Sequence, residues 1–355
     1  MISTESLTTE WIDAVSKELK YPDKGLLEKA IRALSLLELL VKAGCPLCFK
    51  GGSSLLLLLR NTLHRISIDV DIICPPGTYI NQYLTKLQDY GFTRAIPTGT
   101  EHPGGNVPVS HSKVFYEIAY NPMQDDEEGY IRLDVLYEDI PYSHTEMVPI
   151  EHPALKTVGE PVMVQVPTKE DILGDKLTAF GPNSIGIPYE KRGRNCSLEI
   201  VKQLYDIGRL FDNVQNFTPA YESFKRVSTV ELGYRNLEGQ IHKYYEDVRQ
   251  TAMCISTRGF AGEGVFPEII HGLSRIKSFM FQQAYLIEFA ITDAAKAAYL
   301  ATSFQHGNTA IEKYTGPDSI TADLSIDSPL PIRLRRLKSS NPEAFFYWAK
   351  TSALL

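Results

Sequence analysis

The sequence of 355 residues predicts an α+β protein, with a mixed α/β N-terminal half and a mainly helical C-terminal half. Short apolar and alternating segments, typical of strands, occur between residues 46 and 166, whereas helical periodicity dominates after residue 168. The chain is also longer than a single hydrophobic core usually supports, so two domains are expected. We place the boundary near residue 160, which gives an α/β domain over 1–160 and a helical domain over 161–355.

The overall composition narrows the class of protein. Hydrophobic residues make up 43% and charged residues 22%, which is typical of globular chains and excludes extensive disorder. The net charge of −7 excludes a generally basic nucleic-acid binder, although a local basic patch could bind RNA. No apolar run reaches the ~20 residues that cross a bilayer, and the N-terminus lacks signal-peptide features. The odd number of cysteines, 5, favours reduced thiols. We therefore expect a cytoplasmic protein that does not contact membranes.

The N-terminal half is predicted to alternate between helices and strands. Two helices open the chain, the second with apolar residues at helical spacing over 26–41. The next segments are short. They are, in order, a strand at 46–50, a helix at 55–59 capped by Ser53 or Ser54, a strand at 65–73, a helix at 79–90, and strands near 92–95, 113–120 and 130–137. An acidic turn over 124–129 would join the last two strands as a hairpin.

The C-terminal half is predicted to be helical after a strand at 162–166. Thr168-Lys-Glu-Asp171 resembles a capping box and would open a helix that includes Asp175 and Lys176. A loop over 181–195 follows. The clearest amphipathic helices after it are predicted at 200–211, 235–248, 276–303 and 342–354.

The strongest sign of chemistry is Gly51-Gly52-Ser53-Ser54 followed by Asp69 and Asp71. Glycines let a backbone approach phosphate oxygens closely, and a helix that begins at the serines points free N–H groups at them. On an alternating strand the two aspartates share one face, where their oxygens could hold Mg²⁺. Each motif alone is commonly structural, as a helix cap or a solvated face. Their order in the chain favours a joint triphosphate site.

A third carboxylate comes from the alternating segment Ile131-Arg-Leu-Asp-Val-Leu136. Its apolar residues face one side, while Arg132 and Asp134 face the other. If this strand lies beside Asp69 and Asp71, three carboxylates converge, which is enough to hold one or two metal ions. Asp134 could then take a proton from an attacking hydroxyl. Ser67 shares the face of the aspartate pair, where it could orient a metal ligand or be a modification site.

These motifs resemble those of the AbiEii/AbiGii-type nucleotidyltransferases. Those proteins are the toxins of type IV abortive-infection toxin–antitoxin systems, within the DNA-polymerase-beta-like nucleotidyltransferase superfamily. The resemblance rests on Phe49-Lys-Gly-Gly-Ser-Ser-Leu55 and Arg65-Ile-Ser-Ile-Asp-Val-Asp-Ile72 and extends over roughly residues 45–210. It implies a nucleotidyltransferase-type mixed sheet with flanking helices, followed by a helical domain that contributes residues to the cleft.

Within that resemblance, Gly52 and Ser53 fall on the phosphate-binding turn, flanked by Gly51 and Ser54. Asp69 and Asp71 fall on the metal pair, and Asp134 resembles the carboxylate of the third strand.

Two more positions match in the helical half. Lys176 resembles a helix lysine that meets the phosphates of the nucleotide. Asp206 falls on the last aspartate of an Arg-Asp-x-x-Asp pattern, in which Lys202 and Gln203 replace the first two residues.

The resemblance implies a Mg²⁺-dependent nucleotidyltransferase, with Mn²⁺ as the alternative metal. It would transfer a nucleoside monophosphate from a nucleoside triphosphate to an acceptor, for which the 3′ end of tRNA is the leading candidate. Such a toxin would pair with a separate antitoxin protein. Two alternatives stay open at this stage. The acceptor could be a small molecule or a protein, or the chain could be a nucleotide-binding regulator without turnover, which the Lys202-Gln203 replacement would suit.

Three further motifs have structural interpretations that we prefer. Cys45-Pro-Leu-Cys48 has CxxC spacing but no second ligand pair, so buried thiols are favoured over a metal or redox site. Two basic clusters, one at 191–194 and one at 333–338, are more typical of solvated surface, although either could bind RNA phosphates.

Overall fold

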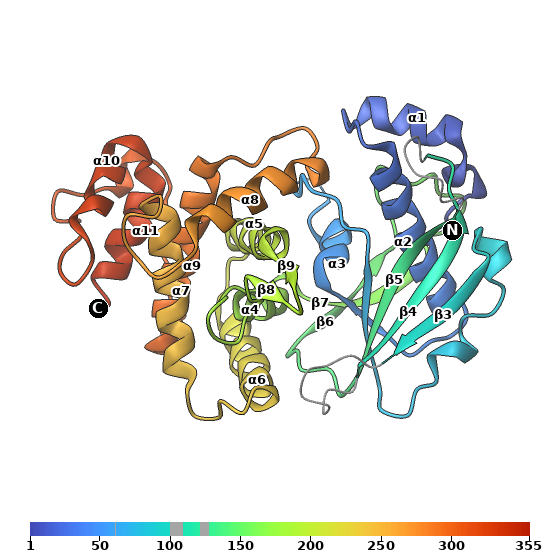
Figure 1. Cartoon of the computed structure of the whole chain (residues 1–355), viewed down its shortest axis with the longest axis horizontal. Coiled ribbons are helices and arrows are strands. Elements are labelled where there is room, and N and C mark those ends of the chain that lie inside the picture. The colour runs from blue at the N-terminus through green and yellow to red at the C-terminus, as the bar shows by residue number, and fades with distance from the viewer. Residues whose placement is uncertain (61, 100–108, 121–127) are drawn as a thin grey trace. The chain divides into compact units, whose positions relative to one another are not determined.

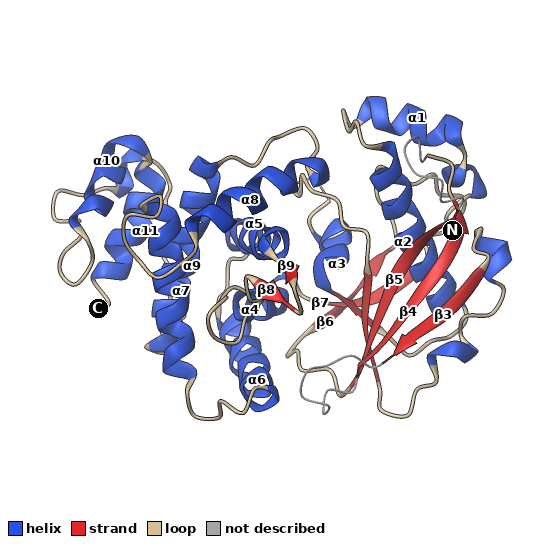
Figure 2. Cartoon of the chain, viewed as in Figure 1, coloured by secondary structure: helices blue, strands red, loops and turns tan. Residues whose placement is uncertain are grey.

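The computed structural model describes residues 1–60, 62–99, 109–120 and 128–355, and it divides into two compact units. Unit 1 comprises Met1–Thr168 together with Ser278–Ala284; unit 2 comprises Lys169–Lys277 and Tyr285–Leu355. The first unit contains the mixed sheet, and the second is mainly helical (Figures 1 and 2). The predicted α+β class is therefore confirmed. The division follows Thr168, and a short segment from the helical half belongs to unit 1.

A five-stranded mixed sheet forms the centre of unit 1. In spatial order its strands are β1 (Cys48–Lys50), β2 (Val70–Cys74), β5 (Glu128–Tyr137), β4 (Val109–Glu117) and β3 (Arg94–Gly99). β2 and β5 run parallel, and the other neighbouring strands are antiparallel. The predicted hairpin of β4 and β5 is confirmed, while residues 124–127 of its acidic turn lie outside the described residues. A separate two-stranded sheet pairs β6 (Thr145–Pro149) with β7 (Met163–Pro167).

The two faces of the sheet differ in polarity, as the alternation in β5 predicts. Ile131, Leu133 and Val135 are fully buried. α2 (Lys24–Lys42) packs against β2 and β5 (Figure 1), and its residues from Leu27 to Leu40 are buried except Lys29. Burial on nearly every side explains why this helix is so apolar. The opposite face of the sheet receives Arg132 and Asp134, and this leaves it available for polar chemistry.

The strand predicted over 65–73 is shorter in the structure, because β2 begins only at Val70. The backbone before it bonds elsewhere. Ile66 N donates to Phe279 O at 2.9 Å, and Phe281 N donates to His64 O at 2.9 Å. These partners lie in the segment Ser278–Ala284, which joins unit 1 from far along the chain. Asp69 therefore lies just before β2, and only Asp71 is a strand residue.

The helix predicted over 79–90 is wrong. The structure has two short 3₁₀ turns, at Ile80–Gln82 and Leu87–Tyr90, separated by Lys86 at φ 56°. A residue with left-handed φ interrupts a right-handed helix. The apolar residues Ile80 and Leu87 are instead buried by two separate turns. The following strand, β3, begins at Arg94 and extends to Gly99.

Unit 2 is built from helices, some of which differ from the prediction. α5 (Ser197–Asn213) covers the helix predicted at 200–211, and α11 (Pro342–Ser352) ends two residues before the helix predicted at 342–354. The other long helices are α4 (Lys169–Ala179), α6 (Thr218–Tyr234), α7 (Ile241–Ser256), α8 (Phe266–Ile276) and α9 (Ile287–Gln305). The helix expected at 235–248 is α7, shifted because Asn236 and Gly239 take positive φ.

The helix predicted over 276–303 is confirmed only from Ile287 onward, as α9, because the chain leaves helical geometry after Lys277–Phe279 and resumes it at Ile287. The intervening residues include the segment that belongs to unit 1. Within the predicted loop 181–195, Glu190–Lys191 and Arg194–Asn195 form a small hairpin, β8–β9. In the described part of the chain, no helix is both long and apolar enough to cross a membrane.

Candidate active site

The glycine-rich turn follows β1 directly and leads into α3 (Gly51–Leu58). Gly51 has φ +77°, and a Cβ on it would overlap the Asp71 carboxylate. A Cβ on Gly52 would lie 2.8 Å from the Arg65 guanidinium. Both positions need glycine because a side chain would collide with Asp71 or Arg65. Gly51 also needs it because its φ is positive. The turn and the aspartate motif form one compact structure.

The two serines after the glycines do not cap the helix, in contrast to the prediction. α3 begins at Gly51, so Ser53 and Ser54 lie within its first turn, and both are fully buried. Ser53 Oγ donates a hydrogen bond to Asp69 O, and Ser54 Oγ donates to Gly51 O at 2.9 Å. Lys50, at the N-cap, provides no side-chain cap. The first-turn N–H groups are those that a helix leaves without an intrahelical partner, and they favour an anion.

A row of polar residues crosses four strands of the sheet on one face. In register, Lys50 of β1 pairs with Asp71 of β2, which pairs with Asp134 of β5, which pairs with His111 of β4. Residues directly opposite each other on neighbouring strands point to the same face. The predicted neighbourhood of Asp71 and Asp134 is therefore present, and Asp69 lies two residues upstream of it.

The Asp134 carboxylate is already engaged by two neighbours. His111 Nδ1 lies 2.7 Å from Asp134 Oδ1. Arg132 donates from Nε to Oδ1 at 3.0 Å and pairs through NH2 with Oδ2 at 2.7 Å. The three side chains are partly accessible, with 17% exposure for Asp134 and 52% for Arg132. Neither His111 nor Arg132 was expected to act at the site.

Arg132 interacts with all three predicted acidic residues. Burial lowers the pKa of its guanidinium, but the hydrogen bond to Asp134 and the negative charges of Asp134, Asp69 and Asp71 outweigh burial and raise it. Among the described residues, no three His, Cys, Asp or Glu side chains are grouped as a metal site. Metal binding by the three aspartates therefore remains a prediction. It is supported by their carboxylate oxygens, which are the donors that Mg²⁺ prefers.

The two motif residues of unit 2 pair with each other. Lys176, on α4, forms an ion pair with Asp206 Oδ2 of α5 at 3.1 Å. It also donates to Gln203 Oε1 at 3.0 Å. Lys176 is largely buried and Asp206 is fully buried, so neither is an ordinary surface charge. Gln203, which departs from the family pattern, thus takes part in binding the lysine. Sequence alone did not indicate that these positions meet.

The CxxC cysteines are core thiols, as predicted. Cys45 and Cys48 are free and buried, and Cys45 Sγ lies 3.9 Å from the buried Cys74 Sγ. Burial raises the pKa of the Cys48 thiol to about 12, which disfavours a reactive thiolate.

Comparison with known proteins connects this geometry to a family. The family described as "Nucleotidyl transferase AbiEii toxin, Type IV TA system" matches residues 35–253, a range that includes both glycine and aspartate motifs and the Lys176–Asp206 pair. No curated protein matches the sequence significantly.

Two solved structures are similar over most of the chain. MenT4, a nucleotidyltransferase toxin from Mycobacterium tuberculosis H37Rv, has 12% identity and a TM-score of 0.49; the match covers 85% of this chain and 94% of MenT4. JHP933 from Helicobacter pylori has 14% identity and a TM-score of 0.42, with coverage of 81% and 94%.

Proposed function

The chain belongs to the AbiEii family of nucleotidyltransferase toxins, and on this premise we propose that it transfers a nucleoside monophosphate to the 3′ end of a tRNA. The reaction would use Mg²⁺, with Mn²⁺ as the alternative, and would release pyrophosphate. As a type IV toxin, the protein would be paired with a separate antitoxin protein. Nucleotidyl transfer is the activity of the family; the metal, the acceptor and the partner are our proposals.

The observation that best supports the proposal is the packing of the glycine turn against the aspartate motif. Gly51 lies too close to the Asp71 carboxylate for any side chain, and Ser53 binds the backbone of Asp69. A phosphate bound at the first turn of α3 would therefore lie beside the carboxylates that attract its counterion. Nucleotidyl transfer needs this neighbourhood, because charge develops on the leaving pyrophosphate.

The residues can be given separate roles in this reaction. The first-turn N–H groups at Gly52, Ser53 and Ser54 would bind triphosphate oxygens, and Ser67 would help orient a ligand of the metal. Asp69, Asp71 and Asp134 would hold the divalent ion, which supplies positive charge that offsets the charge on the phosphates. Asp134 would also position the acceptor hydroxyl or take its proton.

Lys176 would stabilise phosphate charge, and Asp206 would hold its ammonium in position. The 3.1 Å ion pair and the hydrogen bond to Gln203 restrict the lysine to a narrow set of positions. Preorganisation of this kind favours charge stabilisation in the transition state. The role of Lys176 toward the nucleotide rests on the family pattern.

A labelling experiment tests the reaction directly. Purified protein is incubated with Mg²⁺, total tRNA and each of the four α-labelled nucleoside triphosphates in turn. We expect label in the tRNA band for at least one nucleotide and none with Asp69→Ala. Asp89→Ala, an exposed aspartate of the same unit, is the matched control and should label normally.

Two outcomes would contradict the proposal. Nucleotide binding without transfer to any acceptor would indicate a regulator. Label on a small molecule or protein but never on tRNA would replace the acceptor. In cells, expression should arrest growth in the wild type and in Asp89→Ala but not in Asp69→Ala.

A further inference from the structure

The stretch Ser328–Asn341 contains Arg333, Arg335, Arg336 and Lys338 and no acidic residue, in a chain whose formal charge is −7. It lies in unit 2 and outside the range 35–253 that the family match covers. Neither the nucleotidyl-transfer motifs nor the core of the sheet explains why basic side chains are concentrated there.

The local fold directs these basic side chains outward. Residues Ile332–Arg336 form a 3₁₀ turn that continues into a short helix, α10 (Leu337–Ser340). Leu334 and Leu337 are buried and anchor the segment on unit 2. All four basic residues of the stretch are exposed. The segment therefore presents positive charge on a fixed backbone.

An exposed aromatic ring lies against this segment. Phe260 is 69% exposed, and the Arg333 guanidinium lies 4.1 Å from the centre of its ring. The loop that displays Phe260 is closed by the Thr257 hydroxyl, which accepts a hydrogen bond from Ala261 N at 2.9 Å. A single exposed ring is common on protein surfaces, but here the ring and the guanidinium are held together and are both accessible to a ligand.

The basic residues of the stretch differ in availability. Arg335 Nε donates to Ile326 O at 2.8 Å, and its NH2 lies 3.4 Å from Asp327 Oδ1, so this side chain is used within the fold. Arg333 contacts the Phe260 ring, and Lys338 lies 5.5 Å from the Phe345 ring centre. These ring contacts leave the charges uncompensated, because an aromatic ring has no net charge.

We propose that Phe260, Arg333, Arg336 and Lys338, together called the Arg333 surface, bind the RNA substrate. The cationic groups would contact backbone phosphates, for which arginine is well suited because its planar fork binds two oxygens. The Phe260–Arg333 stack would receive an unpaired base, as aromatic and guanidinium planes do in RNA-binding proteins. The inference rests on the proposed RNA acceptor and assigns a contact surface outside the catalytic motifs.

Binding of total tRNA to the full-length protein, measured by fluorescence anisotropy over a range of salt concentrations, tests the surface. The triple variant Arg333→Gln, Arg336→Gln, Lys338→Gln should bind at least about 10-fold more weakly, with a salt slope that is smaller by about 2. The matched control is Lys191→Gln, Arg192→Gln, Arg194→Gln. It removes the same charge from the exposed β8–β9 hairpin and should bind like the wild type.

Phe260→Ala separates stacking from charge. It should weaken binding several-fold and leave the salt slope unchanged, since no phosphate contact is lost. Its ring is mostly outside the core, so the thermal unfolding midpoint should stay close to that of the wild type.

The outcomes distinguish this inference from the proposed function. Equal RNA binding by the wild type and the Arg333-surface triple variant would overturn the inference, as would equal weakening in both triple variants. Binding to vesicles that contain anionic lipid, without binding to RNA, would assign the surface to a membrane instead. RNA binding that requires the Arg333 surface, in a protein that labels no RNA, would support RNA binding at this surface but refute the tRNA acceptor and the role of the bound RNA as substrate.

Discussion

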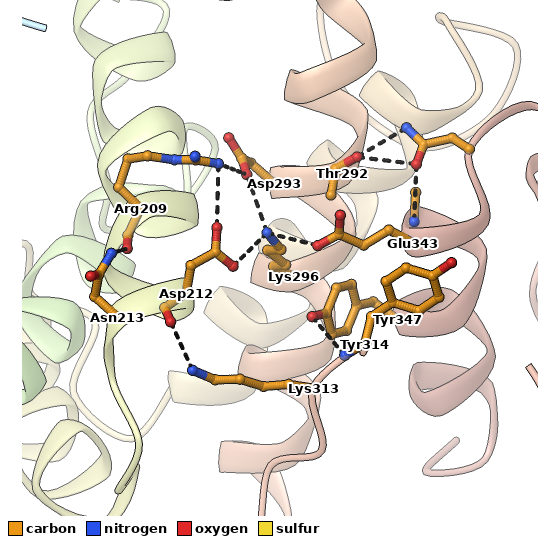
Figure 3. A network of polar contacts seen from close by, with 12 residues as sticks. Arg209, Asp212, Asn213, Thr292, Asp293, Lys296, Lys313, Tyr314, Glu343 and Tyr347 are labelled. Carbon is orange, nitrogen blue, oxygen red and sulfur yellow. Dashed lines mark hydrogen bonds and ion pairs between the residues drawn. The ribbon is translucent and has the colours of Figure 1, made fainter. Parts of the chain in front are cut away.

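In unit 1, Asp134 shares its carboxylate between His111 and Arg132, and 52% of the Arg132 side chain reaches solvent. In unit 2, the Lys296 side chain is 2% exposed and lies among three carboxylates (Figure 3). Its Nζ is 2.7 Å from Asp212 Oδ1, 3.0 Å from Glu343 Oε1 and 3.9 Å from Asp293 Oδ1. Both clusters join basic and acidic groups, but they differ in which group is exposed. In the first the basic side chain, Arg132, reaches solvent. In the second the basic side chain, Lys296, is buried, while Asp212 and Glu343 are 37% and 36% exposed.

The position of each cluster explains its role. The Lys296 network joins α5, α9 and α11, and Arg209 adds a further contact to Asp293 at 3.5 Å. A Cβ on Gly208 would overlap the Asp293 carboxylate, so α5 and α9 approach closely at this point. Burial makes these contacts expensive to break, so they hold the helices together. The Asp134 cluster lies on the polar face of the sheet, where we predict that an ion or substrate replaces Arg132.

The comparison is tested most strongly by removing the charge of Lys296. Lys296→Met roughly keeps the length of the side chain but leaves the buried Asp293 carboxylate beside Asp212 and Glu343 without the ammonium group, so the free energy of unfolding should fall by about 3–5 kcal/mol. Chemical denaturation measures it. Lys225→Met is the control, because Lys225 forms an exposed pair with Glu222 at 3.2 Å and should cost less than about 1 kcal/mol. An equal loss of unfolding free energy in the two variants would show that burial does not make the Lys296 ion pairs more important for stability than exposed ones.

A second test concerns activity rather than stability. Gly51→Ala places a methyl group against the Asp71 carboxylate and should lower nucleotide transfer by about 100-fold or more, because the turn that we propose to bind phosphate must move. Gly77→Ala is the matched control. Gly77 has a similar φ of +85°, and no atom lies within 4 Å of the added Cβ. Gly77→Ala should therefore lose only about 1–2 kcal/mol of folding stability, which is what a left-handed backbone costs. Retained transfer in Gly51→Ala would show that this packing is not needed for nucleotide binding.

The pH dependence of stability provides a third test. Burial raises the pKa of Asp293 from its ordinary value near 3.8 to about 6, despite the opposing charges of Lys296 and Arg209. The folded protein therefore holds more protons than the unfolded chain between about pH 4 and 6. The free energy of unfolding should fall as pH rises through this window, by up to about 3 kcal/mol.

Denaturation of Asp293→Asn across the same pH range should lack this decrease. Asp212→Asn, on the more exposed side of the same network, should retain it. A decrease that persists in Asp293→Asn would assign the pH dependence to another group.

The elements that sequence predicts well are those governed by local periodicity. The buried face of β5 and the long apolar helix α2 follow from the spacing of Ile131, Leu133 and the leucines of residues 26–41. The start of β2 could not be predicted, because residues 64–66 bond to a segment that is more than 200 positions away. The false helix over 79–90 arose because Lys86 adopts a left-handed conformation that its residue type does not favour.

The candidate site was predictable to a similar extent. Alternation placed Arg132 and Asp134 on one face, and the motif spacing indicated the glycine turn. The partnership of Asp134 with His111 depends on the register of β4 against β5, which periodicity does not fix. The helix start was misjudged because Gly51, with positive φ, opens α3 without a side-chain cap. The Lys176–Asp206 pair likewise depends on the packing of two helices.

The smallest expected effect on stability comes from Arg132→Gln. Because the Arg132–Asp134 pair is partly solvated, its loss should change the free energy of unfolding by less than about 1 kcal/mol. Arg132→Gln should have a larger effect on the Mg²⁺ concentration that transfer requires. The guanidinium neutralises the carboxylates on which a divalent ion would depend, so the variant should reach half-maximal transfer at a Mg²⁺ concentration several-fold lower.

Lys113→Gln is the control for Arg132→Gln. Lys113 pairs in register with Arg132 on β4 and carries the same charge, but its ammonium lies over the Tyr130 ring, 4.3 Å from the centre. It should leave the Mg²⁺ requirement close to that of the wild type. If Arg132→Gln instead abolishes transfer at every Mg²⁺ concentration, the guanidinium acts on the substrate rather than as a competitor of the metal. The Arg132–Asp134 ion pair would then have to stay intact during transfer. In that case the two clusters would not differ in whether their ion pairs can be replaced.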